Sequence, residues 1–218
     1  MGWGVRHVVL GLCAGAIGWP WLVGWVSMAP ASVAAEPAAP TAARPAKRSL
    51  TFIDHRGRAV NERDFLGSYM LVFFGYTACP DVCPADLAIM SAAMRHLGAA
   101  AESVQPVFIT FDPDRDTPEV LAGYLRHFHP RLIGLTGTPD QIAAAVHSYG
   151  VVFEREEEEG GAEGSGYSLR HTALTYLIGP DGKGVTMFDH GSDPREMADE
   201  ILAQLEKAAL ASAAGGTP

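Results

Sequence analysis

The chain has 218 residues, of which 48% are hydrophobic and 19% charged, and its formal net charge is −9. This length fits one domain with a modest surplus, and the composition predicts a globular core rather than disorder. Arg6 is the only one of the 16 basic residues before residue 36, so 15 basic residues face all 25 acidic ones after it. Such an acidic surface argues against nucleic acid as a partner.

The residues beyond the length of one domain lie at the N-terminus, where residues 8–26 are almost wholly apolar and follow Arg6. A run of about 20 apolar residues is long enough to span a bilayer. The small residues around Ala34 and Ala35 resemble a signal-peptidase site. Residues 1–35 are therefore predicted to be a cleaved export signal or a retained membrane anchor. The anchored form would face the periplasm from the inner membrane, and the cleaved form would lie free in the periplasm.

Three further segments follow, and the middle one carries alternating strand and helix signals. Residues 36–48 are a Pro/Ala-rich spacer, 49–212 are predicted to be one domain, and 213–218 are predicted to be a disordered tail. The expected elements are two short strands about a turn at Arg56-Gly57, strands at 69–76 and 104–112, a helix at 84–97, Thr-Pro helix starts at 117 and 138 with a short strand between them at 131–137, a hairpin over 171–188, and a helix near 194–210.

This order predicts an α/β domain with a thioredoxin-like mixed sheet and helices on both faces. An acidic, Gly-containing run interrupts it at residues 154–168. We expect this run to be a solvated loop without core-forming residues. A weak cation-binding loop is the alternative interpretation.

Two cysteines, Cys79 and Cys83, lie in "GYTACPDVCPADL", each directly before a proline. Because a residue before proline favours extended backbone, both are expected to be non-helical, with Cys83 as the N-cap and Pro84 as the first residue of a helix. The third cysteine, Cys13, lies inside the apolar run. An isolated pair in an oxidising compartment is a structural staple, a redox couple or a metal site. The staple is the weakest of the three, because a bridge over so short a loop adds little stability.

The pair is chemically suited to a soft metal ion. A helix N-terminus lowers the pKa of a thiol, and two thiolates at one junction favour copper(I), zinc or iron–sulfur over hard cations. Firm binding needs a third group, and seven of the eight histidines follow residue 35. His171 is the strongest candidate, because it lies at the start of a predicted strand whose preceding loop approaches the cysteine turn in thioredoxin-like folds.

Three blocks resemble the successive signatures of the Sco/SenC family: "FFGYTACPDVCPADL", "ITFDPDRDTPEVLAGYLRHF" and "RHTALTYLIGPDG". That family comprises membrane-tethered, thioredoxin-fold copper proteins that assist assembly of cytochrome c oxidase. The resemblance covers about residues 49–210. It implies that Cys79, Cys83 and His171 bind about one copper ion, Cu(I) or Cu(II), per chain. It makes Asp112 and Asp116 candidate secondary groups beside the metal.

The resemblance implies a copper-binding assembly factor whose partner is the copper-bearing subunit of the oxidase or another of its assembly factors. The alternative is a thiol–disulfide oxidoreductase, with Cys79 and Cys83 as its catalytic redox pair, that keeps the copper-ligand cysteines of a client reduced. The two roles are compatible. The long acidic run before His171 departs from the family pattern, and no Met-rich or His-rich tract typical of a bulk copper scavenger is present.

Overall fold

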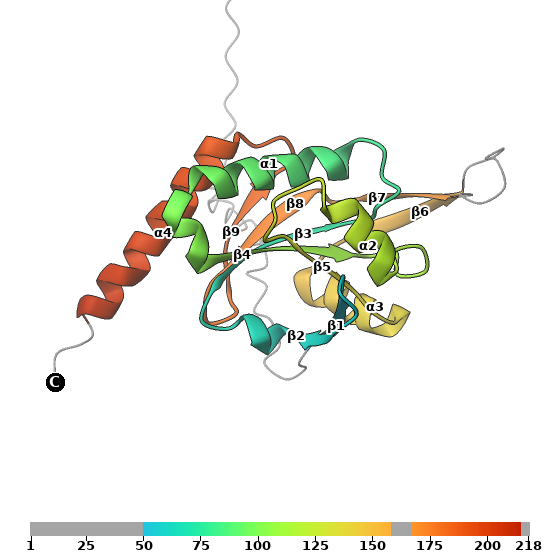
Figure 1. The fold of residues 1–218 in the computed structure, drawn as a ribbon, viewed down its shortest axis with the longest axis horizontal. Helices are drawn as coiled ribbons and strands as arrows, with labels where there is room; N and C mark the ends of the chain where they lie inside the picture. Colours follow the sequence, from blue (N-terminus) through green and yellow to red (C-terminus); the bar gives the residue numbers. More distant parts are fainter. Residues whose placement is uncertain (1–49, 158–166, 215–218) are drawn as a thin grey trace, which may run out of the picture. The chain divides into compact units, whose positions relative to one another are not determined.

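A computed structural model describes residues 50–157 and 167–214 of the chain (Figure 1). The predicted signal or anchor at 1–35, the spacer at 36–48 and most of the predicted tail lie outside the described residues. Within the described residues, no helix is both long and apolar enough to cross a membrane.

A seven-stranded mixed sheet forms the centre of the described fold, in the order β2-β1-β5-β4-β3-β8-β9. β3 pairs in parallel with β4, and β4 with β5, whereas the other neighbours are antiparallel. The strands are β1 (Thr51–Asp54), β2 (Ala59–Asn61), β3 (Tyr69–Gly75), β4 (Val104–Thr110), β5 (Ile133–Thr136), β8 (Leu174–Ile178) and β9 (Gly184–Asp189). All seven residues of β3 are buried, as expected of a continuous apolar run in the middle of a sheet.

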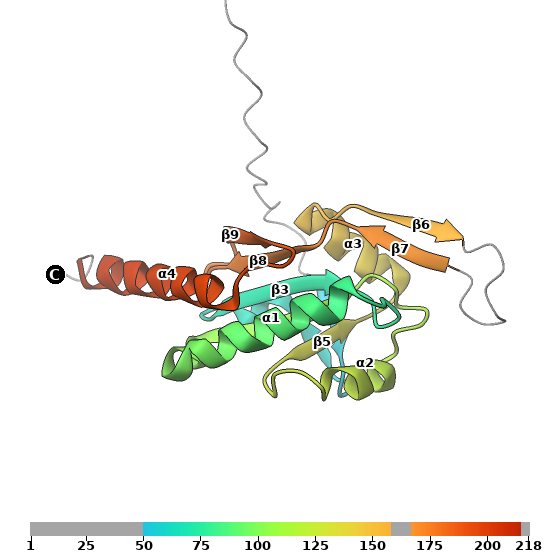
Figure 2. The ribbon, with the colours of Figure 1, turned by 90° about the horizontal axis from the view of Figure 1, so that it is seen from above.

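Helices cover both faces of this sheet, which confirms the prediction. They are α1 (Val82–His96), α2 (Pro118–Leu125), α3 (Pro139–Tyr149) and α4 (Pro194–Ala214), with short 3₁₀ turns η1 (Glu62–Phe65) and η2 (Gly98–Ser103). Figure 2 shows α1 and α2 on one side of β3 and β5, and α3 on the other. Alternation along β3 accounts for this, since Phe73 stacks on Phe108 while Phe74, pointing the opposite way, contacts Tyr149 of α3.

Local sequence chemistry fixes the helix ends that were predicted best. The side chain of Thr117 accepts a hydrogen bond from the N–H of Val120, and Thr138 forms a complete capping box at the start of α3. α3 ends at Gly150, whose φ of 67° is a conformation that glycine adopts without strain.

The expected core faces are also present. The apolar side chains of α1 at one face are all buried, namely Leu87, Met90, Met94 and Leu97. α4 packs against α1 through a face that includes the fully buried Ile201. The final helix extends to Ala214, beyond the expected end near residue 210.

The prediction of a solvated loop at 154–168 is wrong at both of its ends. β6 (Phe153–Glu157) and β7 (Tyr167–His171) pair as an antiparallel ladder, from Phe153 opposite His171 to Glu157 opposite Tyr167. The hairpin extends away from the main sheet in both views (Figures 1 and 2). The acidic side chains of this run did not indicate that its two ends pair as strands. The hydrogen bonds of a β-ladder join backbone groups and form irrespective of side-chain charge. The centre of the acidic run, 158–166, lies outside the described residues.

Candidate metal centre

The cysteine turn follows β3, and the expected position of its helix start is wrong. α1 begins at Val82 with Asp81 as its N-cap, so Cys83 is the second helical residue rather than the cap. Pro84 is tolerated in this first turn because the N–H groups there have no acceptor inside the helix. The preference of a pre-proline residue for extended backbone is overridden by the burial of Cys83, which is 0% exposed.

Cys83 is packed directly against the end of β3. A Cβ atom added at Gly75 would lie 2.8 Å from the sulfur of Cys83 and 2.8 Å from the ring of Phe108. Only glycine therefore allows α1 to approach the strand so closely at this point. The arrangement fixes one sulfur at the carboxyl end of a central strand.

Cys79 lies in the turn before α1 and is partly exposed, and both cysteines are present as thiols. The backbone N–H of Cys83 donates to the sulfur of Cys79 at 3.4 Å, so this sulfur takes the place of a helix cap. The side-chain hydrogen bond to Cys79, followed by burial, raises the pKa of the Cys83 thiol well above its ordinary value. The pKa of Cys83 is therefore shifted in the direction opposite to the one expected for a thiol at a helix terminus.

Asp116, expected as a secondary group at the metal, is fully buried behind the cysteine turn. Its carboxylate accepts hydrogen bonds from the N–H of Thr77 at 3.0 Å and from the hydroxyls of Thr77 at 2.5 Å and Thr110 at 2.6 Å. Burial raises the pKa of Asp116, and these hydrogen bonds offset only part of that effect. The contacts tie the start of the cysteine turn to the end of β4.

Asp112 is also buried and forms a short ion pair with Arg115. The guanidinium of Arg115 in turn lies over the ring of Tyr76, 5.6 Å from its centroid. Phe111 contacts the same ring, with centroids 5.5 Å apart. The segment after β4 thus packs against the residue that follows β3.

His171 ends β7 and pairs with Phe153 at the end of the hairpin nearest β8. Two contacts hold this end of the hairpin beside the cysteine turn. The N–H of Leu169 donates to the hydroxyl of Tyr76 at 3.3 Å, and the ring of Phe153 stacks on Phe111 at 5.2 Å. The backbone of His171 is therefore two residues from a direct contact with the cysteine segment, and its side chain lies outside what the structure describes.

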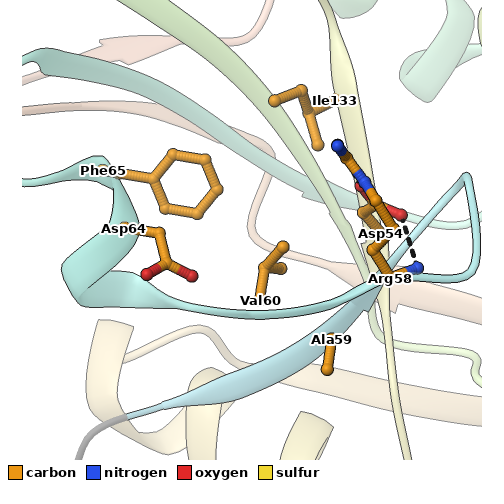
Figure 3. A pocket seen from close by; sticks show the side chains of 7 residues that line it. All are labelled: Asp54, Arg58, Ala59, Val60, Asp64, Phe65 and Ile133. Atoms are coloured by element: carbon orange, nitrogen blue, oxygen red, sulfur yellow. Dashed lines mark hydrogen bonds and ion pairs between the residues drawn. The ribbon is translucent and has the colours of Figure 1, made fainter.

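No three metal-ligating side chains converge in the described part of the chain. The donors that are placed still fit a soft ion, because two thiols share one turn and one of them is partly exposed. A largely apolar groove of about 440 Å³ is lined in part by Phe111, Phe153 and Leu169, and neither cysteine belongs to its lining. A second cavity, of about 270 Å³, lies among β1, β2 and η1 (Figure 3) and has no thiol or histidine in its lining.

Sequence reasoning missed one further polar pair beside α1. Asp86, which is 4% exposed, accepts from the Nδ1 of His190 at 3.0 Å and from the N–H of Gly191 at 3.2 Å. This pair fastens the first turns of α1 to the loop before α4. The only signal was an acid close after Cys83, and nothing in the sequence indicated its partner 104 residues away.

The fold and the dithiol turn define a thioredoxin-like protein with two cysteines where β3 meets α1. The chain belongs to the SCO1/SenC family, whose model matches residues 38–206. It is 40% identical over 151 residues to the human protein "Protein SCO2 homolog, mitochondrial", covering 68% of this chain and 56% of that protein. It is also 40% identical over 147 residues to a SCO2-like protein of Rickettsia felis, covering 67% of this chain and 71% of that one.

Solved structures agree with this assignment. The crystal structure of Arabidopsis thaliana ScoI with copper bound matches with a TM-score of 0.68 and 33% identity, covering 73% of this chain and 98% of that one. Bradyrhizobium japonicum ScoI with copper bound matches with a TM-score of 0.65 and 38% identity, covering 72% and 97%. The chain spans 56–57% of the length of the human and bovine relatives it matches.

Proposed function

We propose that this chain is a copper-binding assembly factor that delivers copper to cytochrome c oxidase or matures its copper centre. The observation that carries the proposal is that contacts of Tyr76 with Leu169 and of Phe111 with Phe153 hold the strand that ends at His171 beside the cysteine turn. Ligands of open α/β sheets bind at the carboxyl ends of the strands, which is where Cys79 and Cys83 lie. The structures of two relatives that share this fold were solved with copper bound.

In this proposal Cys79 and Cys83 bind copper as thiolates and His171 supplies an imidazole. Soft sulfur donors select Cu(I), and three ligands satisfy that ion. Cu(II) would need a fourth group, such as water or a carboxylate. Asp112 and Asp116 support the site from behind the turn, because each already has a partner within the fold.

The proposal includes a location and a partner. The apolar run at 8–26 would hold the protein at the periplasmic face of the inner membrane, or direct its export if it is cleaved. The partner would be the copper-bearing subunit of the oxidase or one of its assembly factors. Human and Rickettsia relatives with SCO2 names support a role within this family.

Metal analysis of the purified protein after reconstitution with Cu(I) tests the proposal. We expect about one copper per chain in the wild type, loss of copper in Cys79→Ala and in Cys83→Ala, and weakened binding in His171→Ala. Cys13→Ala, made in protein that retains residues 1–35, is the matched control, because it removes a thiol from the apolar run and should leave the copper content unchanged. A copper content in Cys79→Ala equal to that of the wild type would contradict the proposal.

A thiol–disulfide oxidoreductase is the second candidate function. The observation that favours it is the asymmetry of the pair, since Cys79 is partly exposed while Cys83 is buried. The two thiols would form one disulfide and pass two electrons and two protons to a client disulfide, which is reduced to two thiols. The reduction potential and the exchange rate with a disulfide peptide separate the roles. A pair that is inert to exchange yet binds copper tightly would leave the assembly role alone.

A further inference from the structure

Tyr76 is the residue at which the two halves of the proposed site meet. It follows β3 directly, and its backbone carbonyl accepts a hydrogen bond from the N–H of Cys79 at 3.3 Å. Its hydroxyl accepts a hydrogen bond from the N–H of Leu169 at 3.3 Å. One residue therefore contacts both the cysteine turn and the strand that ends at His171.

The ring of Tyr76 is held in a fixed place, so its hydroxyl can act as a rigid support. Tyr76 is 4% exposed and packs against Phe111, while the guanidinium of Arg115 covers its ring. Arg115 is itself fixed by its ion pair with Asp112. A side chain packed on both sides loses little further freedom when it accepts a hydrogen bond.

The hydrogen bond between Leu169 and the Tyr76 hydroxyl also holds β7 in place. In an antiparallel ladder, the N–H groups of alternate residues point away from the partner strand. Leu169 donates its N–H to Tyr76 rather than to β6, and its side chain is 7% exposed. Without the hydroxyl this buried N–H would lose its acceptor, and the hairpin would be less well held two residues before His171.

We propose that the Tyr76 hydroxyl is a positioning group that fixes the His171 strand against the cysteine turn and thereby sets the contribution of His171 to copper affinity. This inference rests on the proposed function. Preorganised ligands bind more tightly because less ordering remains to be done on binding. Tyr76 is not a ligand in this scheme, and it acts on copper only through His171.

The test is a double-mutant cycle on the full chain, with Cu(I) affinity measured by competition with a chromogenic chelator. Tyr76→Phe keeps the ring and its packing and removes only the hydroxyl. We expect it to weaken Cu(I) binding about threefold to tenfold, the range for loss of one hydrogen bond. In a His171→Ala background the same substitution should change the affinity less than about twofold, because the group through which it acts is gone.

Tyr176→Phe is the matched control. Tyr176 is a buried tyrosine that packs on Phe74 and Tyr149, on the face covered by α3, and burial alone raises its pKa. Removing its hydroxyl should leave Cu(I) affinity unchanged. A general loss of core stability would weaken binding in both tyrosine variants, whereas the positioning role affects Tyr76→Phe alone.

Amide hydrogen exchange of Leu169 gives a readout that does not depend on copper. Exchange should be slow in the wild type and faster in Tyr76→Phe, with the α1 amides unchanged. Equal Cu(I) affinities of wild type and Tyr76→Phe would overturn the inference, as would an equal weakening in the His171→Ala background. A wild type that binds no copper would instead refute the proposed function, while the exchange data would still report whether Tyr76 holds the strand.

Discussion

Removing the Asp116 carboxylate tests whether the segment after β4 supports the cysteine turn. Asp116→Ala deletes the acceptor of three hydrogen bonds, two of them from Thr77, in a place with no access to water. A buried N–H without an acceptor costs about 1–3 kcal/mol, and each lost hydroxyl bond costs about 1 kcal/mol. Removing a buried charge returns part of this, since burial raises the pKa of Asp116. We expect a net loss of about 2–4 kcal/mol.

Thermal unfolding followed by circular dichroism measures this effect. A loss of this size lowers the Tm by about 4–16 °C in a domain of 150–250 residues. Asp114→Ala is the matched control, since it removes an exposed carboxylate two residues away and should leave the Tm unchanged. Asp116→Asn keeps one acceptor oxygen for Thr77 and should lose less than Asp116→Ala. A Tm for Asp116→Ala within error of the wild type would show that the three hydrogen bonds to Asp116 do not stabilise the fold.

Three further predictions concern stability. Because the pKa of Asp116 in the folded state is raised above 3.8, its protonation contributes most to the free energy of unfolding at low pH. This contribution is lost as the pH rises through the folded pKa, by at most about 1.4 kcal/mol per pH unit. Asp116→Asn should remove this slope in urea unfolding between pH 4 and 7, and an unchanged slope would contradict the assignment of the slope to Asp116. Gly75→Ala forces a Cβ to 2.8 Å from the sulfur of Cys83, so urea unfolding should show a loss of about 1–3 kcal/mol, and no loss would mean that the contact relaxes freely. Ile201→Ala should cost about 2–5 kcal/mol by leaving a cavity between α4 and the body of the domain, and a calorimetric Tm equal to that of the wild type would show that α4 does not dock there.

The parts of the fold that were predicted correctly depend on residues close together in the sequence. Thr117 and Thr138 each precede a proline, and helix capping involves residues within one turn. Both helix starts could therefore be predicted from a few neighbouring residues. The buried run of β3 and the apolar face of α1 are periodic patterns within single elements. The thioredoxin-like order then follows from the order of the elements.

Some of the contacts that were missed join residues far apart in the sequence. Leu169 and Tyr76 are 93 residues apart, and Thr77 and Asp116 are 39 apart, so no local pattern reports their contacts. The β6–β7 hairpin was missed because acidic side chains dominated its pattern, while its backbone pairs as an ordinary ladder. Cys83 was predicted to be the N-cap because residues before proline favour extended backbone. In the structure it is helical, and its sulfur packs closely against Gly75.

The three proposed copper ligands were all predicted from the sequence. Cys79 and Cys83 were singled out by their spacing and their two prolines, whereas His171 was singled out by its position at a strand start and by the family resemblance. The structure places the backbone of His171 at the end of β7 nearest β8, with Leu169, two residues earlier, in contact with Tyr76. The role of His171 as the third ligand is therefore the claim that a direct measurement at the metal tests.

X-ray absorption at the copper edge of the Cu(I)-loaded protein tests that role. We expect two sulfur scatterers and one nitrogen scatterer in the wild type, and loss of the nitrogen with both sulfurs retained in His171→Ala. A wild-type spectrum that contains sulfur alone, or a nitrogen that persists in His171→Ala, would contradict the assignment of Cys79, Cys83 and His171 as one copper site.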